Sequence, residues 1–253
     1  MTSLFAELRR IVDEGGRAVV LTVVAGEQVG AKLLVREDGT TVGDGPGELA
    51  AFASDALRRG RSHVIALGAQ TVFADVFAPP ARLFVYGAVD TAEALCAAAK
   101  QLGWTTIVAD ARPLFATRDR LPSADEILVA WPEEAFAQVQ PDTGTAVVVL
   151  THDDKFDLPA LRAALASEAF YIGALGSRRN QERRRALLLD AGVAEAELER
   201  IAGPSGLDIG AESPAETALS MLAEILATRA GRSGGPLKDA ATRIHAEPLV
   251  GKK

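Results

Sequence analysis

The residues best placed to do chemistry lie between Phe170 and Glu216. An apolar run ends there in Gly176, Ser177 and Arg178, and a helical pattern follows. Such a strand–turn–helix brings free backbone N–H groups, a hydroxyl and a guanidinium to one point, which suits an anion. The sequence therefore predicts an anion-binding turn at these three residues.

Five arginines lie on the helix that follows this turn or at its start. Arg178, at the turn itself, is the predicted anion ligand because its planar fork matches phosphate oxygens. Arg183 and Arg184 are predicted to point to water. A second glycine turn, with Gly206 and Asp208, leads into the next long helix and is predicted to face the first turn.

His152 follows the strand that precedes the anion-binding turn. Ligands of open α/β sheets bind beyond the carboxyl ends of the strands, so His152 is expected beside Arg178. Three interpretations of His152 and Asp153 stay open: metal ligands, an acid/base pair, or hydrogen-bond partners of the next loop. A metal site would need a third ligand from Asp208 or Glu212, so metal binding is left undecided.

Gly87 occupies the first position of the turn where a Rossmann fold carries its G-x-G-x-x-G/A fingerprint. Ala92 fits the third glycine position, but Val89 stands where a glycine would let the backbone approach a pyrophosphate. Asp90 adds negative charge beside it and is predicted to cap the following helix. Tight NAD(P) binding is therefore not expected.

Asp110 ends the next predicted strand, about 20 residues further on, where an acidic residue binds the ribose of a dinucleotide. An equally good interpretation is that Asp110 simply ends the strand and pairs with Arg112. The sequence does not separate these two roles.

Apolar runs and helical spacing indicate the elements that position these turns. From residue 82 onward, continuous branched runs alternate with helical stretches, which is typical of a parallel sheet buried on both faces. The fold class is therefore α/β: a small N-terminal α/β domain over residues 1–77, then a Rossmann-like doubly wound parallel sheet over residues 82–229. Two prolines in the segment 78–81 mark the predicted boundary. Residues 230–253 are predicted to form a mobile tail, or to dock on a partner.

In the larger domain the predicted strands are 83–86, 105–109, 127–131, 146–150 and 170–175, and the predicted helices are 91–102, 132–136, 159–166 and one that begins at a capping box over 213–216. The smaller domain is predicted to carry a helix over 48–60.

Composition and charge exclude several classes of protein. Of the 253 residues, 48% are hydrophobic and 24% charged, as in globular proteins. No apolar run reaches the roughly 18 residues of a membrane helix, and no signal-peptide pattern opens the chain, so a cytoplasmic protein is expected. A net charge of -7 argues against nucleic-acid binding. A single cysteine, Cys96, excludes an internal disulfide and a multi-cysteine metal site.

Three motifs resemble the XdhC/CoxI family, whose members are accessory proteins for xanthine dehydrogenase and carbon monoxide dehydrogenase. The motifs are Val147-Val148-Val149-Leu150-Thr151-His152-Asp153, Tyr171-Ile172-Gly173-Ala174-Leu175-Gly176-Ser177-Arg178, and Gly206-Leu207-Asp208-Ile209-Gly210-Ala211 followed by Ser213-Pro214-Ala215-Glu216. The resemblance covers roughly residues 12 to 228 and implies a role in maturing molybdenum hydroxylases.

The resemblance implies that the protein binds molybdenum cofactor (molybdopterin), helps it acquire its terminal sulfur and delivers it to the apoenzyme. The predicted anion site would suit the phosphate or the dinucleotide diphosphate of that cofactor. The cofactor-binding candidates are Gly176, Ser177, Arg178, Gly206, Asp208, His152, Gly87 and Asp110.

The chain departs from the family pattern at three places. The segment 26–29 lacks the proline and arginine of the family's Gly-Ser-x-Pro-Arg loop, and the segment 43–48 lacks the cysteine of its Gly-Gly-Gly-Cys turn. The segment 87–90 reads Gly-Ala-Val-Asp instead of Gly-Ala-Gly-His. The chain is therefore identified as a divergent member, in which cysteine-based sulfur handling is not expected.

We interpret the chain as a binding and delivery factor whose partner is a molybdenum hydroxylase apoenzyme, and no catalytic residue is assigned. Whether it is also an enzyme is undecided. An NAD(P)-dependent oxidoreductase and a ligand-free regulatory or scaffolding homologue are the alternatives. The client enzyme, the form of the cofactor and the oligomeric state, a homo-oligomer included, stay open.

Overall fold

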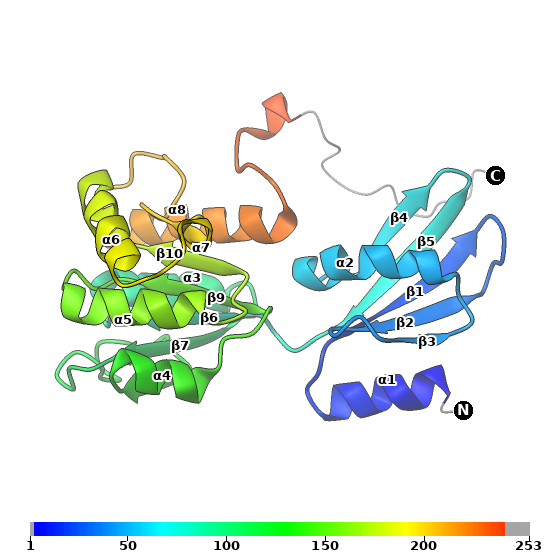
Figure 1. The fold of residues 1–253 in the computed structure, drawn as a ribbon, viewed down its shortest axis with the longest axis horizontal. Helices are drawn as coiled ribbons and strands as arrows, with labels where there is room; N and C mark the ends of the chain where they lie inside the picture. The colour runs from blue at the N-terminus through cyan, green and yellow to red at the C-terminus, as the bar shows by residue number, and fades with distance from the viewer. Residues whose placement is uncertain (1–2, 241–253) are drawn as a thin grey trace. The chain divides into compact units, whose positions relative to one another are not determined.

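The protein folds as two compact units, each with its own β-sheet (Figure 1). The chain passes from the first unit to the second between Pro79 and Pro80, and the second unit ends at Gly234. The structure, a computed structural model, describes residues 3–240. The two prolines that separate the units stand in the segment that the sequence marks as a boundary.

The smaller unit is an antiparallel sheet in the order β3-β2-β1-β5-β4. Its elements are α1 (Leu4–Asp13), β1 (Ala18–Ala25), β2 (Lys32–Arg36), β3 (Thr41–Gly43), the 3₁₀ helix η1 (Gly47–Phe52), α2 (Ala53–Arg59), β4 (His63–Leu67) and β5 (Gln70–Phe77).

Both faces of this sheet are covered, because successive side chains of a strand point to opposite faces. Val19, Leu21 and Val23 of β1 belong to the apolar cluster that includes α2, whereas Val20 belongs to the cluster that includes Ile11 of α1. Figure 1 shows α1 and α2 on opposite sides of the sheet. This two-sided burial explains why β1 is apolar along most of its length.

The larger unit is a six-stranded parallel sheet in the order β11-β10-β9-β6-β7-β8. Its strands are β6 (Arg82–Tyr86), β7 (Thr105–Asp110), β8 (Glu126–Val129), β9 (Thr145–Val149), β10 (Tyr171–Ala174) and β11 (Ile201–Ala202). The strand order reverses between β6 and β9, and such a switch point is where open α/β sheets bind ligands. The predicted α/β class with a Rossmann-like parallel sheet is confirmed.

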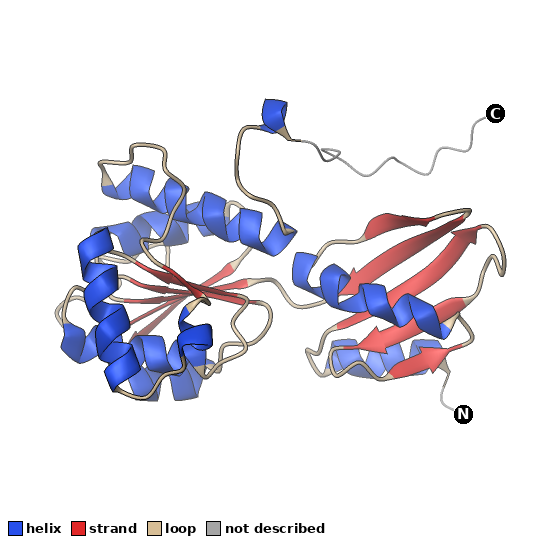
Figure 2. Cartoon of the chain, turned by 45° about the horizontal axis from the view of Figure 1, so that its top comes forward, coloured by secondary structure: helices blue, strands red, loops and turns tan. Residues whose placement is uncertain are grey.

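Helices cover this sheet on both faces (Figure 2). They are α3 (Asp90–Lys100), α4 (Pro132–Val139), α5 (Asp154–Leu165), α6 (Arg178–Asp190), α7 (Glu195–Leu198) and α8 (Pro214–Ala230). The 3₁₀ turn η2 (Leu237–Asp239) follows in the chain, outside this unit. Helices α3 and α8 share one apolar cluster with Leu83 and Val85 of β6. Helices α4, α5, α6 and α7 share the other with Phe84 and Tyr86. Each residue of β6 after Arg82 is therefore buried, which produces the continuous apolar run.

The predicted capping box at the start of α8 is confirmed. The Ser213 hydroxyl accepts a hydrogen bond from the Glu216 N–H at 3.2 Å, and the Glu216 carboxylate accepts one from the Ser213 N–H at 2.8 Å. Pro214 is the first helical residue, and Gly231 ends the helix in the left-handed conformation, with a φ of 64°. Local capping chemistry thus explains both ends of α8.

Several predicted bounds are wrong. The helix predicted over 48–60 is a 3₁₀ helix followed by α2, and the strand predicted over 127–131 is Glu126–Val129. Helix α5 begins at Asp154 rather than Pro159, because the Asp153 carboxylate caps it by accepting from the Lys155 N–H at 3.0 Å. Neither α7 nor the two-residue strand β11 is predicted by the sequence patterns.

No helix within residues 3–240 has the length and apolar character needed to cross a membrane. Residues 241–253 of the predicted mobile tail lie outside the described residues.

Candidate functional site

The predicted site residues follow the carboxyl ends of five strands of the larger sheet. Gly87 follows β6, Asp110 ends β7, His152 follows β9, Gly176 follows β10, and Gly206 lies a few residues after β11. Because all six strands are parallel, their carboxyl ends lie at one edge of the sheet. We name this the ligand edge.

Asp110 is 1% exposed and holds the turn after β6 in place. Its Oδ2 accepts from the Ala88 N–H at 2.9 Å and from Arg112 Nη2 at 2.8 Å. Its Oδ1 accepts from the Arg112 N–H and Nε, both at 2.9 Å. Burial raises the pKa of this carboxyl, but these hydrogen bonds and the Arg112 charge together outweigh burial. The pKa of Asp110 is therefore lower than that of an ordinary aspartate. Of the two interpretations of Asp110, the hydrogen bonds support pairing with Arg112.

Gly87 allows the turn after β6 to approach the turn after β9. Its φ is 117°, and a Cβ atom there would lie 2.9 Å from Cγ2 of Thr151. The residue is therefore needed for close packing at the switch point, next to His152.

The predicted cap at Asp90 is wrong. Val89, with an extended backbone (φ -109°, ψ 170°), occupies the N-cap position of α3 and provides no side-chain cap. Asp90 is the first residue of the helix, and its carboxylate lies 3.3 Å from Arg120 Nη2. Because the Val89 side chain packs against the apolar cluster of α3 and α8, Val89 is a structural residue of the turn.

The prediction that Arg184 points to water is also wrong, since its side chain is 2% exposed. Its Nη1 donates to the Leu175 carbonyl at 2.6 Å, and its Nη2 donates to the Thr151 carbonyl at 3.2 Å and to the Asp157 carboxylate. Arg184 and Leu188 are the buried residues of α6, one turn apart on its inner face.

Arg184 belongs to a buried network that joins two turns of the ligand edge. Asp157 of α5 has a fully buried side chain and accepts from both Arg184 and the Thr151 hydroxyl. Burial raises the pKa of the Asp157 carboxyl above its ordinary value, although Thr151 and Arg184 act to lower it. The network fixes the Thr151 turn and the Leu175 turn relative to each other. Arg183, by contrast, is exposed and pairs with Asp154.

The predicted anion-binding turn forms the N-terminus of α6. Gly176 has a φ of 142°, and the Ser177 hydroxyl caps the helix by accepting from the Asn180 N–H at 3.2 Å. Arg178, the first helical residue, is exposed, and its guanidinium has no hydrogen-bond or ion-pair partner in residues 3–240. Ser177 is thus a capping residue, whereas Arg178 is available to a ligand.

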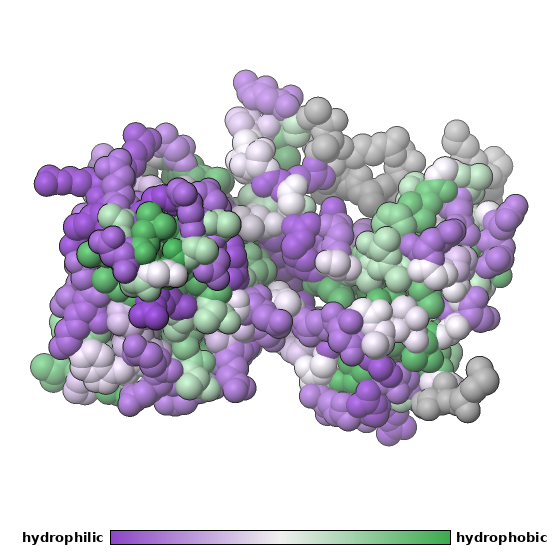
Figure 3. Space-filling view, viewed as in Figure 1, coloured by the Kyte–Doolittle hydropathy of each residue, from purple (hydrophilic) through white to green (hydrophobic). Residues whose placement is uncertain are grey.

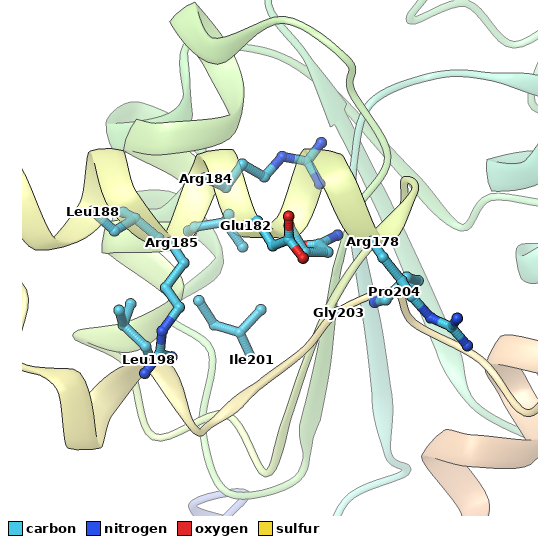
Figure 4. Close-up of a pocket in the computed structure, with 11 residues that line it drawn as sticks. Arg178, Glu182, Arg184, Arg185, Leu188, Leu198, Ile201, Gly203 and Pro204 are labelled. Atoms are coloured by element: carbon cyan, nitrogen blue, oxygen red, sulfur yellow. The ribbon is translucent and has the colours of Figure 1, made fainter.

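Arg178 lines a cavity of about 300 Å³ between α5, α6, α7 and the end of β11. Figure 4 shows Leu188, Leu198 and Ile201 near Arg185 at one end, and Arg178 beside Gly203 and Pro204 at the other. Its remaining lining residues are Leu161, Gln181, Glu182, Arg184, Gly203 and Pro204. In Figure 3 an apolar patch within hydrophilic surface is visible at α5, α6 and α7. We name this cavity the α6 pocket; no sequence pattern predicts it.

The second glycine turn is anchored to α8. The Gly206 N–H donates to Oε2 of Glu224 at 2.8 Å, and the Ser220 hydroxyl donates to the Leu207 carbonyl at 2.6 Å. Asp208 is exposed and does not line the α6 pocket. The part of this loop that lines the α6 pocket with Arg178 is instead Gly203–Pro204.

His152 is exposed, and it makes no hydrogen bond or ion pair with any described residue. Within residues 3–240, no group of three His, Cys, Asp or Glu side chains is placed to hold a metal ion. The structure therefore brings His152, Asp208 and Glu212 into no metal cluster.

Cys96 lies on the buried face of α3 and is fully buried in the core. Burial raises the pKa of its thiol to about 12, so the reactive thiolate is disfavoured at neutral pH. The residue is a core residue, as its alanine-rich surroundings indicate.

The parallel sheet and its switch point define a Rossmann-type domain. The model of the XdhC Rossmann domain matches residues 83–225, which is more than half of the 253 residues. The chain belongs to the XdhC family, which confirms the resemblance found in the motifs.

Two curated relatives are about one third identical to this chain. A probable xanthine dehydrogenase subunit of Bacillus subtilis is 34% identical over 60% of this chain and 44% of its own length. The molybdenum cofactor insertion chaperone PaoD of Escherichia coli is 35% identical over 60% of this chain and 42% of its own length. The chain thus spans less than half the length of these relatives.

A solved structure has the same fold. The crystal structure of a xanthine dehydrogenase from Bacillus halodurans aligns with a TM-score of 0.63 and 22% sequence identity, over 88% of this chain and 65% of that one. The alignment extends well beyond the Rossmann domain match.

Proposed function

We propose that this protein binds molybdenum cofactor and delivers it to the apoenzyme of a molybdenum hydroxylase of the xanthine dehydrogenase type. Membership of the XdhC family and the names of the two curated relatives support this proposal. The single observation that carries it is Arg178, an exposed guanidinium without a side-chain partner within residues 3–240, on the rim of the α6 pocket.

The donor set fits the cofactor, which combines a flat pterin ring system with a phosphate. Arg178 and the first backbone N–H groups of α6 are donors that suit a phosphate. The apolar lining residues of the pocket, Leu161, Leu188, Leu198 and Ile201, suit the faces of a flat ring. The cofactor supplies the molybdenum and the sulfur atoms that bind it, so a protein metal cluster is not required.

The geometry also suits transfer rather than permanent retention. Arg178 is exposed to solvent, and ion pairs at such positions contribute only about 0–1 kcal/mol each. A cargo held mainly at the rim can therefore be released when a client competes for it. The buried Arg184–Asp157 pair keeps the turns in position during this exchange.

The NAD(P)-dependent alternative is less well supported. Asp110 already accepts four hydrogen bonds, so binding a ribose would require breaking some of them. Val89 occupies the position of the glycine that lets the backbone approach a pyrophosphate.

The proposal is tested by comparing Arg178→Ala with Arg179→Ala. Arg179 is the matched control, because it is exposed on the same helical turn but does not line the pocket. Binding of isolated molybdopterin under anaerobic conditions, followed by equilibrium dialysis and pterin fluorescence, should weaken about fivefold in Arg178→Ala, as for loss of one exposed ion pair worth about 1 kcal/mol. The control should bind like the wild type. Equal losses in the two variants would contradict the proposal.

A further inference from the structure

We propose that Glu182 selects the ligand of the α6 pocket by accepting two N–H groups from the edge of a 2-amino-4-oxo heterocycle. Arg178 would then bind the phosphate of the same molecule. The inference deepens the proposed function and rests on it for the nature of the cargo, because the pterin of molybdopterin has such an edge.

Most polar side chains of the pocket are already engaged. Gln181 donates its amide N–H to the Ala174 carbonyl at 3.1 Å. Arg185 pairs with Glu195 at 2.6 Å, and Arg184 belongs to the buried network. Arg178 and Glu182 remain, and neither has a hydrogen-bond or ion-pair partner in the part of the chain that the structure describes.

Arg178 and Glu182 are four residues apart on α6, so they lie one above the other on the same face. Opposite charges at this spacing are close enough to pair, although an arginine that precedes a glutamate is the less favourable order. These two form no ion pair within 4.0 Å. Both instead line the pocket (Figure 4). Two unpaired opposite charges on one rim are suited to a ligand that supplies a donor edge to one and an anion to the other.

The chemistry of Glu182 restricts this ligand. It is the only acidic residue among those that line the pocket, and an ionised carboxylate accepts hydrogen bonds but cannot donate them. Its two oxygens match two adjacent N–H groups, as in the ring N–H and the amino group of a pterin or of guanine. Adenine lacks the ring N–H of that pair, so a pocket of this kind disfavours adenine nucleotides.

The shared ligand chemistry is a flat 2-amino-4-oxo heterocycle that carries a phosphate, in contact with the apolar lining residues Leu188, Leu198 and Ile201. A pterin phosphate and a guanine nucleotide both satisfy it. Two matched pairs of probes therefore test the inference: 6-hydroxymethylpterin phosphate against its 2-oxo analogue, the lumazine, and GMP against IMP, which lacks the amino group.

Binding of each probe is measured by fluorescence or calorimetry to the wild type, to Glu182→Gln and to Glu168→Gln. Glu168 is the matched control, because it is an exposed glutamate outside the pocket. The wild type and the control should prefer the 2-amino member of at least one pair about tenfold, and Glu182→Gln should reduce this preference to roughly twofold or less. The pair that binds more tightly identifies the source as a pterin or a guanine nucleotide.

A wild type without this preference, or a preference that persists in Glu182→Gln, would overturn the inference. The proposed function and the role of Glu182 can be contradicted independently of each other. Molybdopterin binding that depends on Arg178 but not on Glu182 leaves cofactor delivery standing and removes the inference. A Glu182-dependent preference for GMP alone, without pterin binding, supports the role of Glu182 and removes cofactor delivery.

Discussion

Replacing Arg184 by methionine should destabilise the protein severely, because it would leave the Asp157 carboxylate buried and unpaired. The two side chains are 2% and 0% exposed. Removing one partner of such a pair costs about 3–5 kcal/mol, a large part of the roughly 5–15 kcal/mol of stability that a protein has. Two backbone carbonyls, of Leu175 and Thr151, would also lose a donor.

Urea unfolding of the larger unit within the intact chain measures this cost. Arg184→Met and Asp157→Leu should each lower the free energy of unfolding, whereas the double variant should lose less than the sum because no isolated charge remains. Arg183→Met is the matched control, since Arg183 pairs with Asp154 at an exposed position and should cost less than about 1 kcal/mol.

The pH dependence provides an independent check of the same pair. Burial raises the pKa of Asp157, and loss of the Arg184 charge would raise it further. A carboxyl that is buried without a positive partner costs less free energy when it is protonated than when it is ionised. The penalty of Arg184→Met should therefore be constant above the folded pKa of Asp157 in the variant, and it should shrink as the pH falls through that pKa towards the ordinary aspartate value of 3.8. An Arg184→Met variant within about 1 kcal/mol of the wild type at neutral pH would refute the reasoning.

Two further predictions concern the ligand edge. Asp110 has a lowered pKa, so its contribution to stability is present above the ordinary aspartate value of 3.8 and is lost as the pH falls through the folded pKa. The free energy of unfolding, measured from neutral to strongly acidic pH, should therefore depend less on pH in Asp110→Asn than in the wild type. Identical pH profiles of the two proteins would contradict this. Gly206→Ala should cost about 1–3 kcal/mol, because φ is 120° and a Cβ would overlap the Ser220 hydroxyl. Gly210→Ala, with a φ of 70° and open space, should cost only about 1 kcal/mol, and equal thermal shifts in the two variants would show that the close approach is unimportant.

The parallel sheet could be predicted from the sequence because its strands are buried on both faces. Alternate residues of β6 enter different apolar clusters, so the strand appears as an unbroken apolar run. Strand β11 has two residues and leaves no such run. The helix predicted over residues 159–166 begins too late, because the cap formed by Asp153 already starts α5 at Asp154.

The gathering of these turns at one edge of the sheet could be predicted, but their side-chain contacts could not. Parallel strands bring their carboxyl ends to one edge, so the turns at Gly87, His152 and Gly176 follow from topology alone. Whether a side chain faces solvent or the interior depends on packing between helices. The spacing of Arg184 from Leu188 is a signal of burial that the charge of the arginine obscures. The α6 pocket, with Glu182, forms between elements distant in sequence and leaves no local pattern.

Mass spectrometry of the ligand released from protein purified from its own host tests the central claim most directly. We expect molybdopterin or its nucleotide form to be released from the wild type and from Arg179→Ala. Arg178→Ala, purified in parallel, should release much less of it. Release of NAD(P) would support an oxidoreductase instead. An empty wild-type protein in a stable complex with another protein would support a scaffold and contradict cofactor delivery.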